Sequence, residues 1–169
     1  MKQSGKRIQV NLGKIKKVSS FYKEGVHQSP VGRWWGLITP EDLFLCDSGG
    51  QYKFGTTDVT RTICFSKPIK SIKNVFTKVL KGHIAVVQSN LEKDNVGKKI
   101  DFRARKFLNK DGLDYAHGTG HGVGYFLNVH EGPQSLSKFN SIKLKEGMIL
   151  SNEPGFYKKG HYGIRIENL

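Results

Sequence analysis

The chain has 169 residues, of which 37% are hydrophobic, and carries a formal net charge of +14 at pH 7. This length gives room for one domain with a core, and the hydrophobic content excludes a wholly disordered chain. No run of 18 apolar residues is present, which excludes a membrane-spanning helix, and no apolar signal segment follows the basic first residues. We therefore expect a cytoplasmic protein in which Cys46 and Cys64 are reduced.

The strong positive charge raises the question of a nucleic-acid partner. Residues 1–38 hold eight lysines and arginines against one acidic residue and show poor hydrophobic periodicity, so we interpret them as a basic N-terminal arm. The other lysines are scattered, and no aromatic-basic recognition motif accompanies them. We therefore expect a basic protein that has no nucleic-acid partner.

Two strands are predicted directly after the arm. Leu43 to Cys46 are apolar and predict a buried strand that ends at Asp47. A glycine-containing connection leads to residues 58–65, whose β-branched side chains predict a second strand. Asp47 and Asp58 flank this connection, so their carboxylates can converge on one point, although aspartates at such positions often only cap a turn.

Two helices are predicted to follow. After Pro68, apolar side chains recur at the spacing of one buried helix face. These side chains are Ile72, Val75, Phe76, Val79, Leu80 and Ile84. A second helix is predicted from about Ile100 to Asp111, with Gly112 as its C-cap. We expect both helices to cover one face of a sheet.

Residues 117–133 contain three of the six histidines, and glycine occupies every second position from Gly118 to Gly124. Each glycine disfavours a helix by about 1 kcal/mol relative to alanine, so an extended or looped segment is predicted. In a strand, side chains repeat every two residues, and His117 and His121 then project to the same side. A lone histidine is more often structural than functional, so a site here depends on carboxylates that other strands deliver.

The last part of the chain is predicted to supply two of those carboxylates. Residues 135–140 are expected to form a loop, and Met148 to Leu150 a strand that delivers Glu153. A hairpin that bends at Gly160 leads into residues 164–167. Alternation along these four residues places the two isoleucines on one side and the arginine and glutamate on the other.

Four separated motifs occur in the order typical of one family, and they comprise residues 47–58, 117–133, 153–155 and 164–168. They resemble the X-prolyl aminopeptidases (aminopeptidase P) of the pita-bread metallopeptidases, which also include prolidase, methionine aminopeptidase and creatinase. The resemblance implies an α+β pita-bread fold, a curved antiparallel sheet flanked by helices. It covers residues 39–169, which we expect to form a partial catalytic domain, incomplete at the C-terminus because family members continue with further strand and helix.

The resemblance implies five metal ligands, whose carboxylates would repel one another unless cations neutralise them. The implied ligands are Asp47, Asp58, His121, Glu153 and Glu167. They imply two divalent ions, and this oxygen-rich set with one imidazole suits Mn²⁺, with Co²⁺, Zn²⁺ or Fe²⁺ as substitutes. Asp58 and Glu167 are expected to bridge the ions, Asp47 to chelate one ion, and His121 with Glu153 to complete the other.

The resemblance also implies roles near the substrate. Glu153 is expected to transfer protons, and His130 and His27 to hydrogen-bond the scissile carbonyl oxygen. His117 is expected beside the pocket for the proline ring, and Arg165 to orient a ligand carboxylate. His27 stands twenty residues before Asp47, as expected from the resemblance, although an exposed histidine of the arm is an equally good interpretation.

The implied reaction is hydrolysis of the first bond of a peptide with proline at its second position, by a hydroxide that bridges the two ions. The spacing within residues 117–133 looks more like aminopeptidase P than a prolidase-type dipeptidase or methionine aminopeptidase. Two alternatives stay open: an inactive fragment in which the strand of Glu167 frays, and a prolidase-type dipeptidase. A pita-bread module that binds nucleic acid is a third and less favoured alternative. We expect no membrane partner and consider a homodimer as the oligomeric state.

Overall fold

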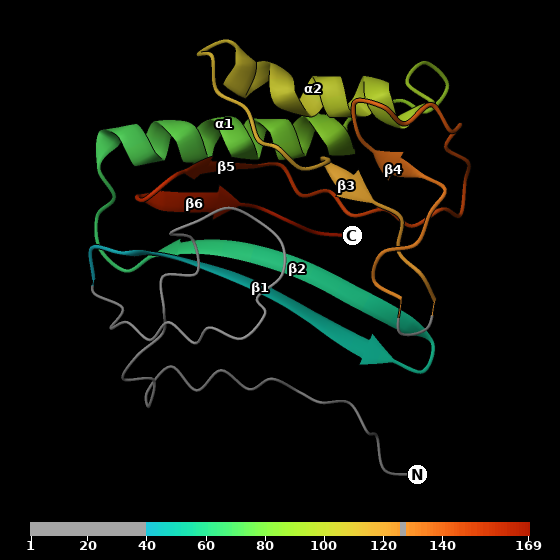
Figure 1. Ribbon diagram of the computed structural model, residues 1–169, viewed down its shortest axis with the longest axis horizontal. Helices are drawn as coiled ribbons and strands as arrows, with labels where there is room; N and C mark the ends of the chain where they lie inside the picture. Colours follow the sequence, from blue (N-terminus) through green and yellow to red (C-terminus); the bar gives the residue numbers. More distant parts are fainter. Residues whose placement is uncertain (1–39, 126–127) are drawn as a thin grey trace.

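The computed structural model describes residues 40–125 and 128–169. Its two helices are α1 (Lys70–Val87) and α2 (Gly97–Asn109). Its strands are β1 (Leu43–Tyr52), β2 (Gly55–Cys64), β3 (Gly120–His121), β4 (Ser135–Leu136), β5 (Gly155–Lys158) and β6 (Tyr162–Arg165). Figure 1 shows both helices side by side on one face of the strands, as the sequence predicts. The predicted basic arm and its His27 lie outside the described residues.

β1 and β2 form a long antiparallel hairpin joined by residues 53–54. The predicted strand pair is confirmed, but its first strand does not end at Asp47, because the glycines that follow it pair with β2 and continue β1. Asp47 faces Thr60 across the ladder, and Gly49 faces Asp58. Since side chains alternate along a strand, the two aspartates lie on the same face of the hairpin. They converge through sheet register rather than through a turn.

The segment that follows β6 lies against β2. The amide of Glu167 donates to the carbonyl oxygen of Thr60 at 3.2 Å, and Asn168 forms an antiparallel bridge with Asn152. The side chain of Glu167 is only 2% exposed. The expectation that this strand frays therefore has no support within the described chain, because Glu167 is both paired and buried.

Residues 149–153 lie between the C-terminal segment and β3. Asn152 pairs with Asn168 on one side, and the backbone of this segment bonds to β3 and its neighbours on the other. This backbone donates to or accepts from residues 119–123 in three hydrogen bonds of 2.8 to 3.2 Å. The strand predicted over Met148 to Leu150 is present only as a bridge between Leu150 and Gly122, within this extended ladder. The loop predicted over residues 135–140 begins instead as β4, which pairs with β3. In the described parts of the chain, the strands thus form three two-stranded antiparallel sheets, and backbone hydrogen bonds of the segments between them connect one sheet to the next.

Gly120 permits the close approach of β3 to this ladder, since a Cβ atom there would lie 1.9 Å from the carbonyl oxygen of Ser151. We expect Gly120→Ala to lower the free energy of unfolding by about 2 to 3 kcal/mol, because the backbone must shift to relieve this overlap. Urea denaturation measures the loss. Gly55→Ala is the matched control, since a Cβ atom at Gly55 meets nothing within 4 Å. Equal stability of the two variants would contradict the prediction.

The two helices pack closely because α1 has a glycine at their crossing. A Cβ atom at Gly82 would lie 2.6 Å from the carbonyl oxygen of Ala104 in α2. Leu80 and Ile84, which the sequence predicts as buried, are 38% and 43% exposed, whereas Val75 and Val79 of the same predicted face are buried. α2 begins three residues earlier than predicted, at Gly97. Within the described ranges, neither helix combines the length and apolar character that crossing a bilayer requires.

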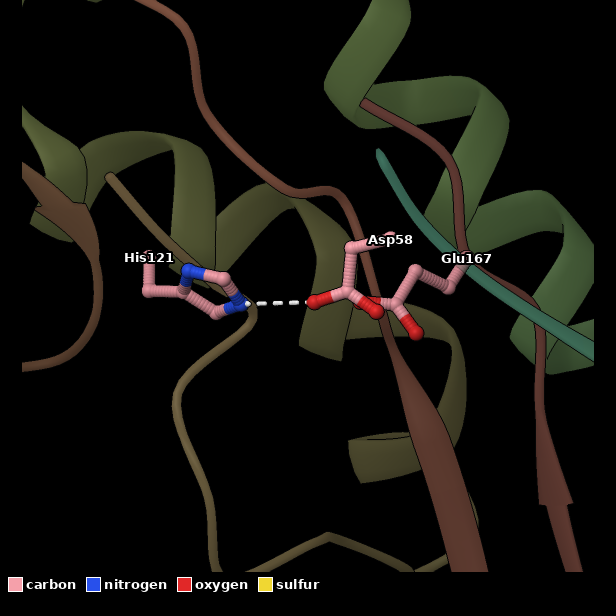
Figure 2. A group of neighbouring side chains, drawn as sticks. All are labelled: Asp58, His121 and Glu167. Atoms are coloured by element: carbon pink, nitrogen blue, oxygen red, sulfur yellow. Dashed lines mark ion pairs between the residues drawn. The ribbon is translucent and has the colours of Figure 1, made fainter. Parts of the chain in front are cut away.

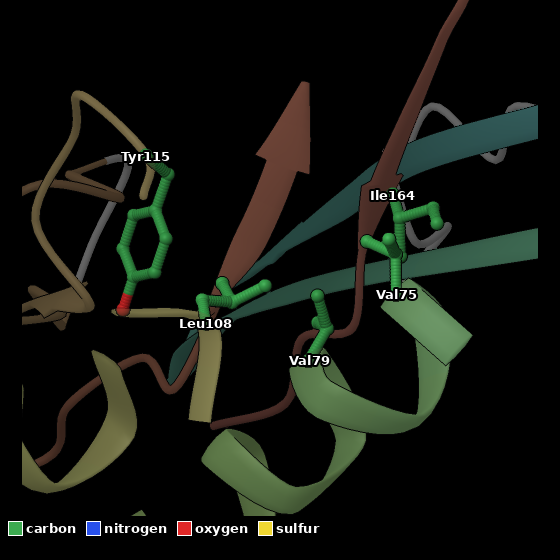
Figure 3. Close-up of a cluster of buried hydrophobic side chains, with 5 residues drawn as sticks. All are labelled: Val75, Val79, Leu108, Tyr115 and Ile164. Atoms are coloured by element: carbon green, nitrogen blue, oxygen red, sulfur yellow. The ribbon is translucent and has the colours of Figure 1, made fainter. Parts of the chain in front are cut away.

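The main core lies between the helices and β6, as Figure 3 shows. It consists of Val75, Val79, Leu108, Tyr115 and Ile164. The turn predicted between β5 and β6 is confirmed at Gly160, which has a φ of +71°. The predicted alternation is also confirmed, because the two isoleucines of residues 164–167 face this core while the arginine and glutamate face away toward β2.

Candidate metal centre

Three side chains from separate parts of the sheet meet at one point. Asp58 comes from β2, His121 from β3, and Glu167 from the segment after β6. One ligand atom from each residue lies within 4.8 Å of the other two. Figure 2 shows the three side chains pointing toward one another. This spacing allows one cation to contact all three.

His121 presents its Nε2 atom to two carboxylates. Nε2 lies 3.4 Å from an oxygen of Asp58 and 3.4 Å from an oxygen of Glu153. Nδ1 lies 3.0 Å from the carbonyl oxygen of Gly122, which fixes the proton on Nδ1 and leaves Nε2 as the ligand atom. Burial lowers the pKa of His121, but hydrogen bonding to Asp58 and attraction to Glu153 outweigh burial and raise it overall. A positive charge is therefore favoured at this position, whether it is a proton or a metal ion.

The two glutamates are held by neighbouring hydroxyl groups. Ser151 Oγ donates to Glu153 at 2.9 Å, and Thr60 Oγ1 donates to Glu167. Burial raises the pKa of Glu153. Burial and then repulsion by Glu153 raise the pKa of Glu167 to about 7. Both shifts indicate that the protein alone supplies too little positive charge for these carboxylates.

Asp47 stands at the edge of the group and is paired with Arg165. The Arg165 guanidinium donates to the Asp47 carboxylate, to Thr60 Oγ1 at 2.9 Å and to the hydroxyl of Tyr157 at 3.2 Å. Burial raises the pKa of Asp47 and its repulsion from Asp58 adds to this effect, although Arg165 opposes both. Arg165 therefore pairs with two carboxylates of the predicted ligand set, Asp47 and, at 3.7 Å, Glu167. It also contacts the Thr60 hydroxyl that holds Glu167.

The remaining predicted site residues lie at different distances from this group. The ring of His130 has its centroid 4.1 Å from that of His121, and its side chain is exposed. His117 is directed to Tyr157, whose hydroxyl lies 2.9 Å from its Nε2 atom. The described part of the chain does not include His27.

Comparison with known proteins identifies the family. The model of metallopeptidase family M24 matches residues 18–169, which is most of the chain. The chain belongs to metallopeptidase family M24. The match begins before residue 39, and the predicted division between arm and catalytic domain stays a prediction.

The M24 chain is similar to named X-prolyl aminopeptidases. It is 51% identical over 147 residues to a probable Xaa-Pro aminopeptidase P of Coprinopsis cinerea, covering 85% of this chain and 24% of the relative. It also superposes on the X-prolyl aminopeptidase of Caenorhabditis elegans, described as a cytosolic enzyme with a di-nuclear active site, with a TM-score of 0.73 and 43% identity. That match covers 83% of this chain and 23% of the other. The chain thus spans about a quarter of the length of these relatives.

Prolidases are also among the similar structures. The prolidase of Pyrococcus furiosus superposes with a TM-score of 0.70 and 30% identity, covering 80% of this chain and 39% of that protein. These superpositions confirm the predicted α+β pita-bread fold. The fold therefore does not distinguish an X-prolyl aminopeptidase from a prolidase, because structures with both names share it.

The donor set of this M24 chain fits divalent cations. It offers one imidazole nitrogen and several carboxylates whose pKa values are raised by burial and mutual repulsion, which two doubly charged ions would relieve. Sequence reasoning missed the supporting hydroxyls of Thr60 and Ser151. Each stands two residues from an acidic side chain in an extended segment, on the same side as Asp58 or Glu153, and this spacing could have indicated them.

Proposed function

We propose that this chain carries the metal centre of an Xaa-Pro aminopeptidase that binds two divalent cations, with Mn²⁺ as the expected ion and Co²⁺, Zn²⁺ or Fe²⁺ as substitutes. The observation that supports this most strongly is the convergence of Asp58, His121 and Glu167 within 4.8 Å. Glu153 lies against the same face of His121 at 3.4 Å. A di-nuclear site in a relative with 43% identity supports the number of cations.

In this proposal, each ligand has a defined place. Asp58 and Glu167 would help to hold both cations, Asp47 would hold one of them, and His121 with Glu153 would hold the other. When bound, such cations lower the pKa of water and polarise the scissile carbonyl. Glu153 accepts a proton from the attacking water and returns it to the leaving proline nitrogen, because burial raises its pKa toward the range useful for acid–base exchange.

Other side chains of the chain orient the substrate and the ligands. His130, beside His121, donates to the carbonyl oxygen of the scissile bond, and His27 is proposed to share this role. His117 lies against the proline ring of the substrate. Arg165 keeps Asp47 in position, as its direct contact with that carboxylate supports.

The proposed substrate is a peptide with proline at its second position. Proline has no amide hydrogen, so a general peptidase cannot grip this bond by backbone hydrogen bonding. The name of the Coprinopsis cinerea relative supports this substrate class. A cytoplasmic location is part of the proposal and is supported by the cytosolic relative of Caenorhabditis elegans. A homodimer stays a prediction.

The test is hydrolysis of three peptides by the chain loaded with Mn²⁺. We expect cleavage of Xaa-Pro-Pro, slower cleavage of the dipeptide Xaa-Pro, and none of Xaa-Ala-Pro. Cleavage of the dipeptide alone would favour the prolidase alternative, which the similarity to the Pyrococcus furiosus structure motivates. Salt-sensitive binding of RNA or DNA without uptake of Mn²⁺ would overturn the proposal in favour of a binding module.

His121→Ala tests the metal centre without any substrate. We expect the dissociation constant for Mn²⁺ to rise by about 100-fold, because the variant removes the imidazole nitrogen that faces Asp58 and Glu153. Isothermal titration calorimetry measures this change. His161→Ala is the control, because His161 is an exposed histidine in the turn between β5 and β6. Similar affinities in both variants would show that Mn²⁺ binds elsewhere.

A further inference from the structure

A buried ion pair on α2 lies behind the histidine segment, which we define as residues 115–121. Asp101 is 1% exposed and Arg105 is 3% exposed, and Arg105 Nε donates to Asp101 Oδ2 at 2.8 Å. Neither side chain is one of the predicted metal ligands or substrate contacts. The pair stands one helical turn apart, so both side chains leave the same face of α2.

Arg105 uses its guanidinium to hold the backbone of the histidine segment. Its NH1 group donates to the carbonyl oxygen of Tyr115 at 2.7 Å and to Asp114 at 2.6 Å. Its NH2 group donates to the carbonyl oxygen of His117 at 2.6 Å. A guanidinium is planar and its donors keep fixed directions, so these bonds fix the positions of two carbonyl groups on either side of Ala116 relative to α2.

Asp101 holds the next part of the same segment through Thr119. Thr119 Oγ1 donates to Asp101 Oδ1 at 2.7 Å. Because this bond uses the single hydroxyl hydrogen of Thr119, the hydroxyl of Tyr115 must be the donor in its own bond to Thr119. Burial raises the pKa of Tyr115, which keeps that hydrogen in place. Arg105 closes the network by lying over the Tyr115 ring, 3.9 Å from its centroid.

The network connects directly to the candidate metal centre. The carbonyl oxygen of Thr119 accepts from the amide of Glu153 at 2.8 Å. Two residues further, the amide of His121 donates to Ser151 Oγ, which in turn donates to Glu153. A shift of Thr119 therefore moves both His121 and Glu153.

Stability alone does not account for this arrangement. The cost of removing two charges from water offsets most of the attraction within a buried ion pair, so apolar residues of the same size often stabilise a protein as well. What an apolar pair cannot do is bind two carbonyl oxygens and one hydroxyl in fixed directions. The special property of Asp101 and Arg105 is the geometry that they impose on the histidine segment.

We propose that Asp101 and Arg105 are positioning residues, which act through Thr119 and the backbone of the histidine segment to place His121 in the metal centre and His117 against Tyr157. This inference rests on the proposed function for its consequence, weaker cation binding. The placement of the two rings is a property of the metal-free chain and can be tested without that function.

The test compares two substitutions at one buried position in the 169-residue chain. Thr119→Val removes the hydroxyl that Asp101 holds, whereas Thr119→Ser keeps it. In the metal-free protein, nuclear Overhauser contacts of the His117 ring with Tyr115 and of the His121 ring with His130 report ring placement, since the centroids lie 4.9 Å and 4.1 Å apart. We expect Thr119→Ser to keep these contacts and Thr119→Val to lose them.

Titration with Co²⁺ alone gives the second readout. We expect Thr119→Val and Arg105→Lys to raise the dissociation constant by about tenfold or more and to alter the visible spectrum of bound Co²⁺, because lysine cannot reproduce the guanidinium fork. Val79→Ala controls for general destabilisation, since Val79 lies in the core and its apolar side chain forms none of the hydrogen bonds of the network. It should leave the affinity of the folded protein unchanged.

The outcomes separate the two proposals. The positioning role would be overturned if Thr119→Val and Arg105→Lys had the same ring contacts and the same Co²⁺ affinity as Val79→Ala. If the unmodified chain takes up no Co²⁺, the proposed function fails, and the ring contacts alone decide the positioning role. If Arg105→Lys does not fold, the Thr119 pair still provides the comparison.

Discussion

Replacing Glu153 with glutamine is expected to lower the rate of Xaa-Pro hydrolysis by about 10³-fold, the middle of the range for general acid–base catalysis. Glutamine keeps the size of the side chain and its bond with Ser151, but it cannot accept and return a proton. Glu153 lies 3.4 Å from Nε2 of His121, and burial raises its pKa. It is therefore placed to face a bound cation, and its raised pKa favours proton uptake more than that of an exposed glutamate.

The experiment must separate loss of proton transfer from loss of the cation. The turnover number of Glu153→Gln is measured on Xaa-Pro-Pro at Mn²⁺ concentrations that saturate the variant, and Mn²⁺ affinity is measured separately. Glu146→Gln is the control, since Glu146 is an exposed glutamate in the turn before the same segment. A turnover number within tenfold of that of the unmodified chain would remove Glu153 from the catalytic role.

Local patterns in the sequence predicted the parts of the site that depend on strand alternation. Residues 164–167 show this best, because two isoleucines bury one side of the strand and thereby direct Arg165 and Glu167 to the other. The family resemblance then named the residues that should meet. The structure brings Asp58, His121, Glu153 and Glu167 together and places Asp47 beside them through Arg165.

Features that depend on contacts between distant segments could not be predicted in this way. Leu80 and Ile84 fit the apolar periodicity of α1, but they lie at the edge of its buried face and are exposed, whereas Val75 and Val79 of the same predicted face lie in the core. Asp101 and Arg105 have the spacing of an ordinary surface pair on a helix. The histidine segment folds over them and buries them, and no local sequence pattern predicts that contact.

The metal-free chain is expected to lose stability as the pH rises from about 4.5 to about 7, because of Glu167. Its pKa is raised from an ordinary value of 4.5 to about 7 in the folded state, first by burial and then by repulsion from Glu153. Between these values the unfolded chain binds fewer protons than the folded chain, so the free energy of unfolding falls with increasing pH. The difference corresponds to about 3 kcal/mol, a large part of the stability of a small domain.

Urea denaturation in the presence of a chelator, at a series of pH values, measures this effect. Glu167→Gln should remove most of the pH dependence, whereas Glu92→Gln, an exposed control, should retain it. The same slope in Glu167→Gln and in the unmodified chain would show that Glu167 ionises normally in the folded protein.

Mn²⁺ should reverse the direction of this pH dependence. The raised pKa values of Asp47, His121, Glu153 and Glu167 all favour proton binding in the folded state, so protons and cations compete for the same positive position. As the pH rises, protons leave and the cation binds more tightly. A ligand at free concentration L that binds only the folded chain stabilises it by RT ln(1 + L/Kd), so the stabilisation grows as the dissociation constant falls. The carboxylates that destabilise the metal-free chain at neutral pH are thus the source of its stability when the cation is bound.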